Sequence, residues 1–444
     1  MFLDGLVYTN VARNLSEGIG DFWHPLHQRF DGLFAEHPPL LMWLQSGFFR
    51  LFGDHLWTED VYNLTVFGTT LLLIVLVWKH LVAPRHYPFV LLPLAFFLLN
   101  QEVQLRYPNT MLECGMTLII LLTVYAYLNL RDRGLPFSAN VAVGVGVCLS
   151  FLAKGPAGLF PLSFPFLYEL ARYRVVSAGA LLVPVSTTTL LLALLMVTVP
   201  EAANFLERYF DQQVLAAVRG ARTENIADYR LQFLQHLLFA NLPAVGIGLL
   251  LLFGRRKASI RTDRRMGYCL LSFGCLAIFP LVISPKQAAY YQLPAIPFLA
   301  LGGGLLLLSG AEGAVRWLGG QRLVVIVLSV ISSLAVLGSL VFAFSLYGTV
   351  DRRDRELLVD VRDIQRVLSS VDVDSQGYRL EINGNDWRRE AERYRIKAYL
   401  LRYARFHSNR SNPNHLLTFK AKPDRLGGEG VLLETDRLRL SRVR

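Results

Sequence analysis

Long apolar runs separated by short polar segments dominate this 444-residue chain. A helix needs about 20 apolar residues to cross a membrane, because backbone amides in lipid must be hydrogen bonded within the segment. Ten candidate spans lie at residues 61–81, 88–99, 111–130, 141–153, 157–170, 178–199, 231–253, 266–283, 288–308 and 323–347. The second, fourth and fifth are short for a span. The pattern predicts a mainly α, polytopic transmembrane protein with about ten spans.

The two ends of the chain follow a different pattern. Residues 1–60 are more polar and include an amphipathic helix expected at 40–52. After residue 347 the sequence becomes charged and alternating, with a helix expected at 386–404 and strands at 378–382, 415–421 and 430–440. We therefore expect three regions: an outer-face segment at 1–60, a transmembrane core at 61–347 and a small extracytoplasmic α/β domain at 348–444.

Composition and charge support this picture and give it an orientation. The chain is 53% hydrophobic and only 18% charged, which excludes an ordinary soluble protein. Basic cytoplasmic loops explain part of its net charge of +11, and no nucleic-acid partner is expected. The basic positions that fall on one side are Lys79, Arg85, Arg131, Arg133, Arg172, Arg174, the cluster at 255–265, Arg316 and Arg322. That side is predicted to be cytoplasmic. The amino terminus then lies outside with no span before it, which predicts that a first helix is missing upstream.

The first candidate for chemistry is the outer-face segment itself. Asp4 and Tyr8 open it, and Glu36 and His37 precede a proline pair that leads into the expected amphipathic helix. A carboxylate where a membrane protein meets water can orient or deprotonate an acceptor hydroxyl. The alternative is that Asp4 caps a surface helix.

The second candidate lies at the outer end of the span at 111–130. Asn109 and Glu113 are four residues apart, so they are expected to share a helix face, and a carboxylate entering a membrane is costly enough to suggest a function. The alternative is that Glu113 lies near the interface, where it reaches back to water or pairs with Arg106.

Two further outer-face motifs carry lysines suited to a phosphate. Lys154 lies in the turn Lys154-Gly155-Pro156, and Lys286 precedes Tyr290 and Tyr291. Either lysine could instead be a membrane anchor, and tyrosines are common at membrane interfaces. The long segment at 201–230 is expected to complete the rim of an outer-face cavity.

These motifs together resemble those of the GT-C membrane glycosyltransferases. The resemblance is to the bacterial branch of the dolichyl-phosphate-mannose protein mannosyltransferase family (glycosyltransferase family 39-like), which includes the lipid A aminoarabinose transferase. It rests on Tyr8, Asn14, Gly18, His37-Pro38-Pro39-Leu40, Trp43, Lys154-Gly155-Pro156, Lys286, Tyr290, Tyr291 and Pro294. The chain has Gly5 where family members commonly have a second acidic residue.

The resemblance implies transfer of a hexose or pentose, with inversion, from a polyprenyl-phosphate donor to a lipid, protein or glycan acceptor. It implies a multi-pass protein of the bacterial inner membrane with its active site on the periplasmic side. Asp4 would be the catalytic carboxylate, with Glu113 and Asn109 as further catalytic candidates. The implied donor-phosphate contacts are Lys154, Lys286, Tyr290, Tyr291 and Arg106, and the implied acceptor-side residues are Tyr8, Glu36 and His37.

Two rival functions and the question of a metal stay open at this point. A flippase or transporter of lipid-linked sugars would place ionisable residues at mid-membrane, and a catalytically inactive relative is the other alternative. The sequence identifies no cofactor with certainty and leaves a divalent metal open. The four cysteines fall inside apolar runs, without metal-ligand spacing.

Overall fold

A computed structural model describes the chain over residues 3–29, 33–216, 232–254, 264–283, 287–319, 354–368, 377–381, 387–408, 415–419, 431–434 and 438–442, with a few single positions between. The chain divides into two compact units. We call residues Met1–Ala35, Met42–Tyr62 and Gly348–Arg444 the α/β unit, and residues Glu36–Leu41 and Asn63–Tyr347 the helical unit. The predicted regions 1–60 and 348–444 thus contribute to the same unit.

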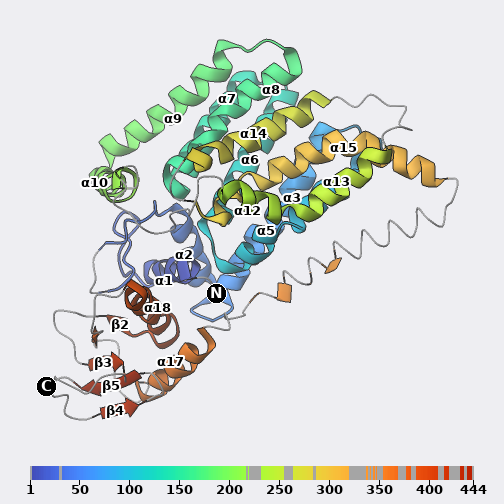
Figure 1. Cartoon of the computed structure of the whole chain (residues 1–444). Helices are drawn as coiled ribbons and strands as arrows, with labels where there is room; N and C mark the ends of the chain where they lie inside the picture. The colour runs from blue at the N-terminus through green and yellow to red at the C-terminus, as the bar shows by residue number, and fades with distance from the viewer. Residues whose placement is uncertain are drawn as a thin grey trace. The chain divides into compact units, whose positions relative to one another are not determined.

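The helical unit is a bundle of apolar helices (Figure 1). Its elements are α3 (Thr58–Leu81), η1 (Pro84–Val90), α4 (Leu91–Leu98), α5 (Gln101–Arg106), η2 (Tyr107–Asn109), α6 (Leu112–Asp132), α7 (Pro136–Lys154), η3 (Gly155–Ser163), α8 (Phe164–Tyr173), α9 (Ala178–Thr198), α10 (Pro200–Tyr209), η4 (Phe210–Leu215), α12 (Gln232–Ala240), α13 (Leu242–Gly254), α14 (Arg264–Ile283), η6 (Ala289–Gln292) and α15 (Ile296–Gly319). The first residues of α3 belong to the α/β unit. The described residues contain 5 helices long and apolar enough to cross a membrane, or up to 7 if each of two bent helix pairs is one span. The chain is therefore a multi-pass membrane protein.

Several predicted spans take a different form in the structure. The segments predicted at 141–153 and 157–170 belong to one apolar stretch, Pro136–Tyr173. The segment predicted at 88–99 is half of a bent pair with residues 101–109. The segment predicted to begin at 288 starts with the short η6, and α15 begins only at Ile296. Pro294 lies just before that start. An α-helix does not run through it because proline has no backbone N–H to donate and disfavours helical dihedrals at the preceding residue. The span predicted at 323–347 lies outside the described residues apart from single positions.

Glycines bring helices of the bundle into close contact. Gly146 of α7 lies against Thr123 of α6, and Gly302 of α15 lies against the backbone of Gly267 in α14. A Cβ atom at either glycine would collide with its neighbour. Small residues at helix contacts are typical of membrane bundles, where close packing takes over from the hydrophobic effect.

The α/β unit contains α1 (Leu3–Ser16), most of α2 (Leu40–Phe52), α17 (Arg355–Leu368), α18 (Trp387–Ala404) and a five-stranded sheet. The strands are β1 (Gly377–Glu381), β2 (His407–Ser408), β3 (His415–Phe419), β4 (Val431–Glu434) and β5 (Leu438–Arg442), in the order β2-β1-β3-β5-β4. The predicted helices at 40–52 and 386–404 are confirmed as α2 and α18. The run predicted as one strand at 430–440 is instead the antiparallel pair β4 and β5, and α17 was not predicted.

Buried polar groups join the two ends of the sequence inside the α/β unit. Asn10 Nδ2 donates to the carbonyl oxygen of Ala398 at 2.9 Å, and Arg13 Nη1 donates to that of Leu401 at 2.7 Å. Burial lowers the pKa of Arg13 to about 10, although the nearby Asp54 and Glu17 carboxylates raise it. Arg13 therefore stays charged at neutral pH while it holds α1 against α18.

Candidate functional site

The predicted outer-face segment begins as a helix and not as a loop. Asp4 lies in the first turn of α1, where a carboxylate interacts favourably with the amide end of the helix dipole. Tyr8 is buried one turn later, and its ring meets Phe34 edge-on at 6.3 Å between centroids. The alternative of a surface helix is wrong, because α1 is buried from Gly5 to Leu15, and the catalytic role of Asp4 stays a prediction.

The helical unit contains a buried ion pair between two predicted site residues. The ammonium group of Lys154, the last residue of α7, contacts Oε1 of Glu113 in the first turn of α6. The Glu113 side chain is only 1% exposed and the Lys154 side chain 9%. Glu113 Oε2 is also buried and has no hydrogen-bond partner among the residues that the structure describes. The pair is thus held by one contact, with one carboxylate oxygen left as an acceptor.

Aromatic rings extend this site toward a second cation. The Lys154 ammonium lies 5.3 Å from the centroid of the Tyr291 ring and 5.9 Å from that of Tyr290. The guanidinium of Arg106 lies 5.1 Å from the same Tyr290 ring. Two cations over neighbouring rings in a partly dry environment can attract an anion while the aromatic faces stabilise them. We call Arg106, Glu113, Lys154, Tyr290 and Tyr291 the Glu113–Lys154 site.

A second carboxylate at this site was not predicted. Arg106 Nε forms an ion pair with Glu102 Oε2 at 2.9 Å, so the alternative that Arg106 pairs with Glu113 is wrong. Glu102 and Arg106 are four residues apart on α5, a spacing that could have revealed the pair. Asn100 caps this helix by accepting from the backbone amides of Glu102 and Val103. Each cation of the site therefore has its own carboxylate.

Asn109 and Glu113 do not share a helix face. Asn109 ends η2, whereas Glu113 belongs to α6, and between them Thr110 is left-handed with φ 51° and Met111 is extended. Asn63 Nδ2 holds this break by donating to the carbonyl of Pro108 at 3.2 Å and to Thr110 Oγ1 at 3.0 Å. The Asn109 amide donates to the carbonyl of Leu105 at 2.6 Å. The predicted shared helix face was wrong because Thr110, which is not a glycine, adopts a positive φ and interrupts the helix between Asn109 and Glu113.

The turn after Lys154 depends on glycine. Gly155 has φ 73°, and a Cβ atom there would collide with the phenol of Tyr209 in α10. Tyr209 is buried, as is Phe205 on the same helix. The segment predicted as a long loop at 201–230 thus begins with a helix, α10, that packs on the Lys154 turn.

The remaining predicted residues are distributed as follows. Glu36 and His37 belong to the helical unit, whereas Asp4 and Tyr8 belong to the α/β unit. Lys286 and the end of the 201–230 segment lie outside the described residues. Within the described ranges no group of three His, Cys, Asp or Glu side chains is placed to hold a metal ion. Glu113 Oε1 is occupied by the ammonium of Lys154, which disfavours a cation there.

The fold is shared with solved structures of ArnT and of an oligosaccharyltransferase, which confirms the fold expected from the resemblance. The chain is similar to the crystal structure of ArnT from Cupriavidus metallidurans bound to undecaprenyl phosphate, with a TM-score of 0.67, 14% identity and coverage of 99% of this chain and 93% of that chain. For the apo state of that ArnT the TM-score is 0.64 at 15% identity, with coverage of 98% of this chain and 92% of that chain.

A more distant match is the apo form of the Archaeoglobus fulgidus oligosaccharyltransferase. Its TM-score is 0.53 at 12% identity, over 93% of this chain and 61% of that chain. No family model and no curated protein sequence matches this chain. The likeness is therefore one of fold, and the chemistry has to be argued from the residues.

Proposed function

We propose that this protein transfers a sugar from a polyprenyl-phosphate donor to an acceptor at the outer face of the bacterial inner membrane. The observation that carries the proposal is the Glu113–Lys154 site, a buried ion pair beside two tyrosines and a second cation on a GT-C fold. The similar ArnT structure contains undecaprenyl phosphate, which supports a donor of that class. The acceptor is a lipid, a protein or a glycan.

In the proposed reaction the acceptor nucleophile attacks the anomeric carbon of the sugar. A bond from that carbon to the acceptor forms while the bond to the phosphate oxygen breaks, and the lipid phosphate leaves with the bonding electrons. Attack from the face opposite the phosphate inverts the configuration. The acceptor proton passes to a carboxylate, and cations stabilise the charge that grows on the leaving phosphate.

The residues of the Glu113–Lys154 site fit the second of these tasks. Lys154 and Arg106 supply donors and charge, and Tyr290 and Tyr291 offer rings and hydroxyl groups beside them. Glu113 holds the Lys154 ammonium in place until a phosphate competes for it. Lys286 would add a further cation. Asp4 keeps the role of acceptor-side carboxylate that the resemblance implies, with Tyr8, Glu36 and His37 as acceptor-side residues.

The decisive assay is release of labelled sugar from polyprenyl-phosphate sugars by the purified protein in detergent with a candidate acceptor. Asp4→Asn should abolish transfer while expression and membrane insertion stay unchanged. Asp363 of α17 is a partly exposed carboxylate paired with Arg366, so Asp363→Asn is the matched control and should keep full activity. Transport of the donor without glycosyl release would favour the flippase alternative, and full transfer by Asp4→Asn would remove Asp4 from the mechanism.

A further inference from the structure

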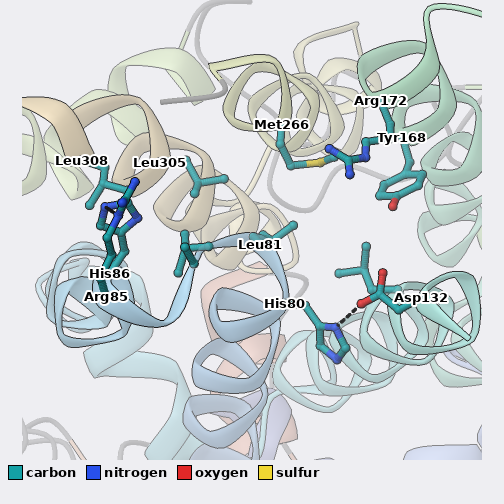
Figure 2. Close-up of a pocket in the computed structure, with 13 residues that line it drawn as sticks. His80, Leu81, Arg85, His86, Asp132, Tyr168, Arg172, Met266, Leu305 and Leu308 are labelled. Atoms are coloured by element: carbon teal, nitrogen blue, oxygen red, sulfur yellow. Dashed lines mark hydrogen bonds and ion pairs between the residues drawn. The ribbon is translucent and has the colours of Figure 1, made fainter. Parts of the chain in front are cut away.

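The helical unit has a polar cavity away from the Glu113–Lys154 site (Figure 2). It has a volume of about 360 Å³ and is lined by residues of five α-helices and of η1. Its lining comes from α3 and the segment that follows it, from the last turn of α6, and from α8, α14 and α15. None of these residues was a predicted site residue.

The length of α6 separates this cavity from the Glu113–Lys154 site. Glu113 lies in the first turn of α6, and Asp132, which lines the cavity, is its last residue. The 19 intervening steps of 1.5 Å give about 28 Å, close to the thickness of the hydrocarbon core. The two sites therefore lie at opposite ends of a membrane-spanning helix. The cavity is at the end predicted to be cytoplasmic from its arginines and lysines.

The carboxylates at this end are already engaged. Asp132 Oδ2 lies 2.8 Å from His80 Nδ1, and Glu312 Oε1 lies 2.6 Å from His86 Nε2. Glu169 accepts from Arg131 at 3.0 Å and from the backbone amide of Ser177 at 2.7 Å. Two arginines that line the cavity remain outside these ion pairs, although Arg85 Nε donates to His86 Nε2 at 3.2 Å.

Arg85 and Arg172 are those remaining arginines. Both are exposed, and neither has a carboxylate within ion-pair distance among the residues that the structure describes. Figure 2 shows Arg172 with Tyr168 and Met266 on one side of the cavity, and Arg85 with His86 and Leu308 on the other. Two guanidinium groups facing one cavity match a phosphate, whose oxygens accept paired hydrogen bonds from each planar fork.

The wall between the two arginines is apolar. Leu81, Leu128, Leu305 and Leu308 line it, and Met266 adds a thioether. A small soluble anion gains nothing from such a wall, whereas a lipid can lay its chain on the leucines and its phosphate between the arginines.

We propose that this cavity binds the phosphate group of an anionic lipid in the cytoplasmic leaflet, with Arg85 and Arg172 as its ligands. The proposal does not depend on sugar transfer at the Glu113–Lys154 site. A phosphate monoester headgroup fits best, because it presents more free oxygens and more charge than a phosphodiester. Binding there would link η1 and α8 through one headgroup.

The test uses the full-length protein, freed of lipid in detergent and titrated without any donor sugar. The three probes are short-chain phosphatidic acid, short-chain phosphatidylcholine and inorganic phosphate, with binding followed by native mass spectrometry. Phosphatidic acid should bind the most tightly, and inorganic phosphate should not compete with it. Equal binding of the two lipids would overturn the proposal, and competition by inorganic phosphate would reassign the cavity to a soluble anion.

A matched pair of double variants locates the site. Arg85→Gln/Arg172→Gln should weaken phosphatidic acid binding about tenfold or more, the loss expected for charge-assisted hydrogen bonds. Arg133→Gln/Arg174→Gln removes the same charge from exposed positions at the same membrane end that do not line the cavity, and should leave binding within about twofold. Arg85→Lys/Arg172→Lys keeps the charge and should bind at an intermediate level. An equal loss in both glutamine variants would mean only nonspecific surface attraction.

Discussion

Two buried ion pairs, one in each unit, are built in opposite ways. In the α/β unit, Arg402 donates through Nη1 to Asp54 at 2.7 Å and through Nη2 to Glu59 at 2.6 Å and to the carbonyl of His55 at 2.9 Å. In the helical unit, Glu113 and Lys154 share one contact, and Glu113 Oε2 has no hydrogen-bond partner in the described part of the chain.

The difference separates a structural pair from one with capacity for a ligand. A buried charge is stable only when nearly all its hydrogen bonds are made, and Arg402 meets that condition. An ion pair that lacks a hydrogen bond destabilises the folded protein, and a substrate that supplies the missing hydrogen bond removes this destabilisation. We therefore read Arg402 as the residue that fixes the α/β unit, and the Glu113–Lys154 site as the one prepared for chemistry.

The largest expected effect is on stability, at Arg402. Arg402→Met leaves Glu59 buried without its partner and should lower the free energy of unfolding by about 3–5 kcal/mol. Arg405→Met is the matched control, since Arg405 binds the same Asp54 at 2.8 Å but its side chain is 58% exposed. It should cost less than about 1 kcal/mol. Thermal unfolding in detergent measures both losses of stability. Equal losses would contradict the expectation that the buried contacts of Arg402 stabilise the α/β unit more than the exposed contact of Arg405.

Within the Glu113–Lys154 site, activity should respond most at Lys154. Lys154→Met should lower glycosyl transfer about 100-fold, the loss typical of one electrostatic group at a reacting centre. Glu113→Gln/Lys154→Met replaces the pair by neutral groups of similar size, so it should stay within about 1 kcal/mol of the wild type in stability while transfer stays low. Lys79→Met is the control, because Lys79 also lies over a tyrosine ring, that of Tyr87, at 5.8 Å. A stable and fully active double variant would contradict a role in catalysis.

The turn that positions Lys154 should be sensitive to one methyl group. Gly155→Ala combines a positive φ with a collision against Tyr209 and should destabilise by about 2 kcal/mol or more. Gly134 has nearly the same φ, 74°, with open space around it, so Gly134→Ala should cost only about 1 kcal/mol. The difference between the two unfolding midpoints reports the Tyr209 contact. Identical midpoints would show that α10 moves aside freely.

The smallest effect is a pH dependence in the α/β unit. Burial, with help from the nearby positive charges of Arg13 and Arg29, lowers the pKa of His407 from 6.5 to about 3. His407 Nδ1 accepts from the backbone amide of Arg29 at 3.1 Å, which requires the neutral ring. Below about pH 6.5 the unfolded chain binds the extra proton, so stability should fall by about 1 kcal/mol per pH unit. His407→Asn, whose Oδ1 can replace the acceptor, should flatten that slope measured from pH 7 to 5; an unchanged slope would assign it to other groups.

Local periodicity was enough to predict some elements but not the site. The apolar face of residues 40–52 and the pattern of 386–404 predict α2 and α18 with nearly correct ends. The prediction that Asn109 and Glu113 share a helix face was wrong because Thr110 adopts a left-handed conformation, which its residue type does not predict. The contact of Glu113 with Lys154 joins residues 41 positions apart, and only the packing of α6 on α7 creates it. Residue types were thus enough to predict candidate site residues, whereas the contacts between these residues depend on tertiary structure.

The hydrogen bonds from α1 to α18 have a consequence for biogenesis. Asn10 and Arg13 are made well before their carbonyl acceptors, which lie 388 positions later in the chain. At about 5–20 residues per second a ribosome needs roughly 20–80 s to make that stretch. During this time α1 must wait without its partner while the helical unit is inserted. Completion of the α/β unit therefore requires synthesis through α18, and a chain that ended before α18 would expose the unsatisfied polar groups of α1 to quality-control proteases.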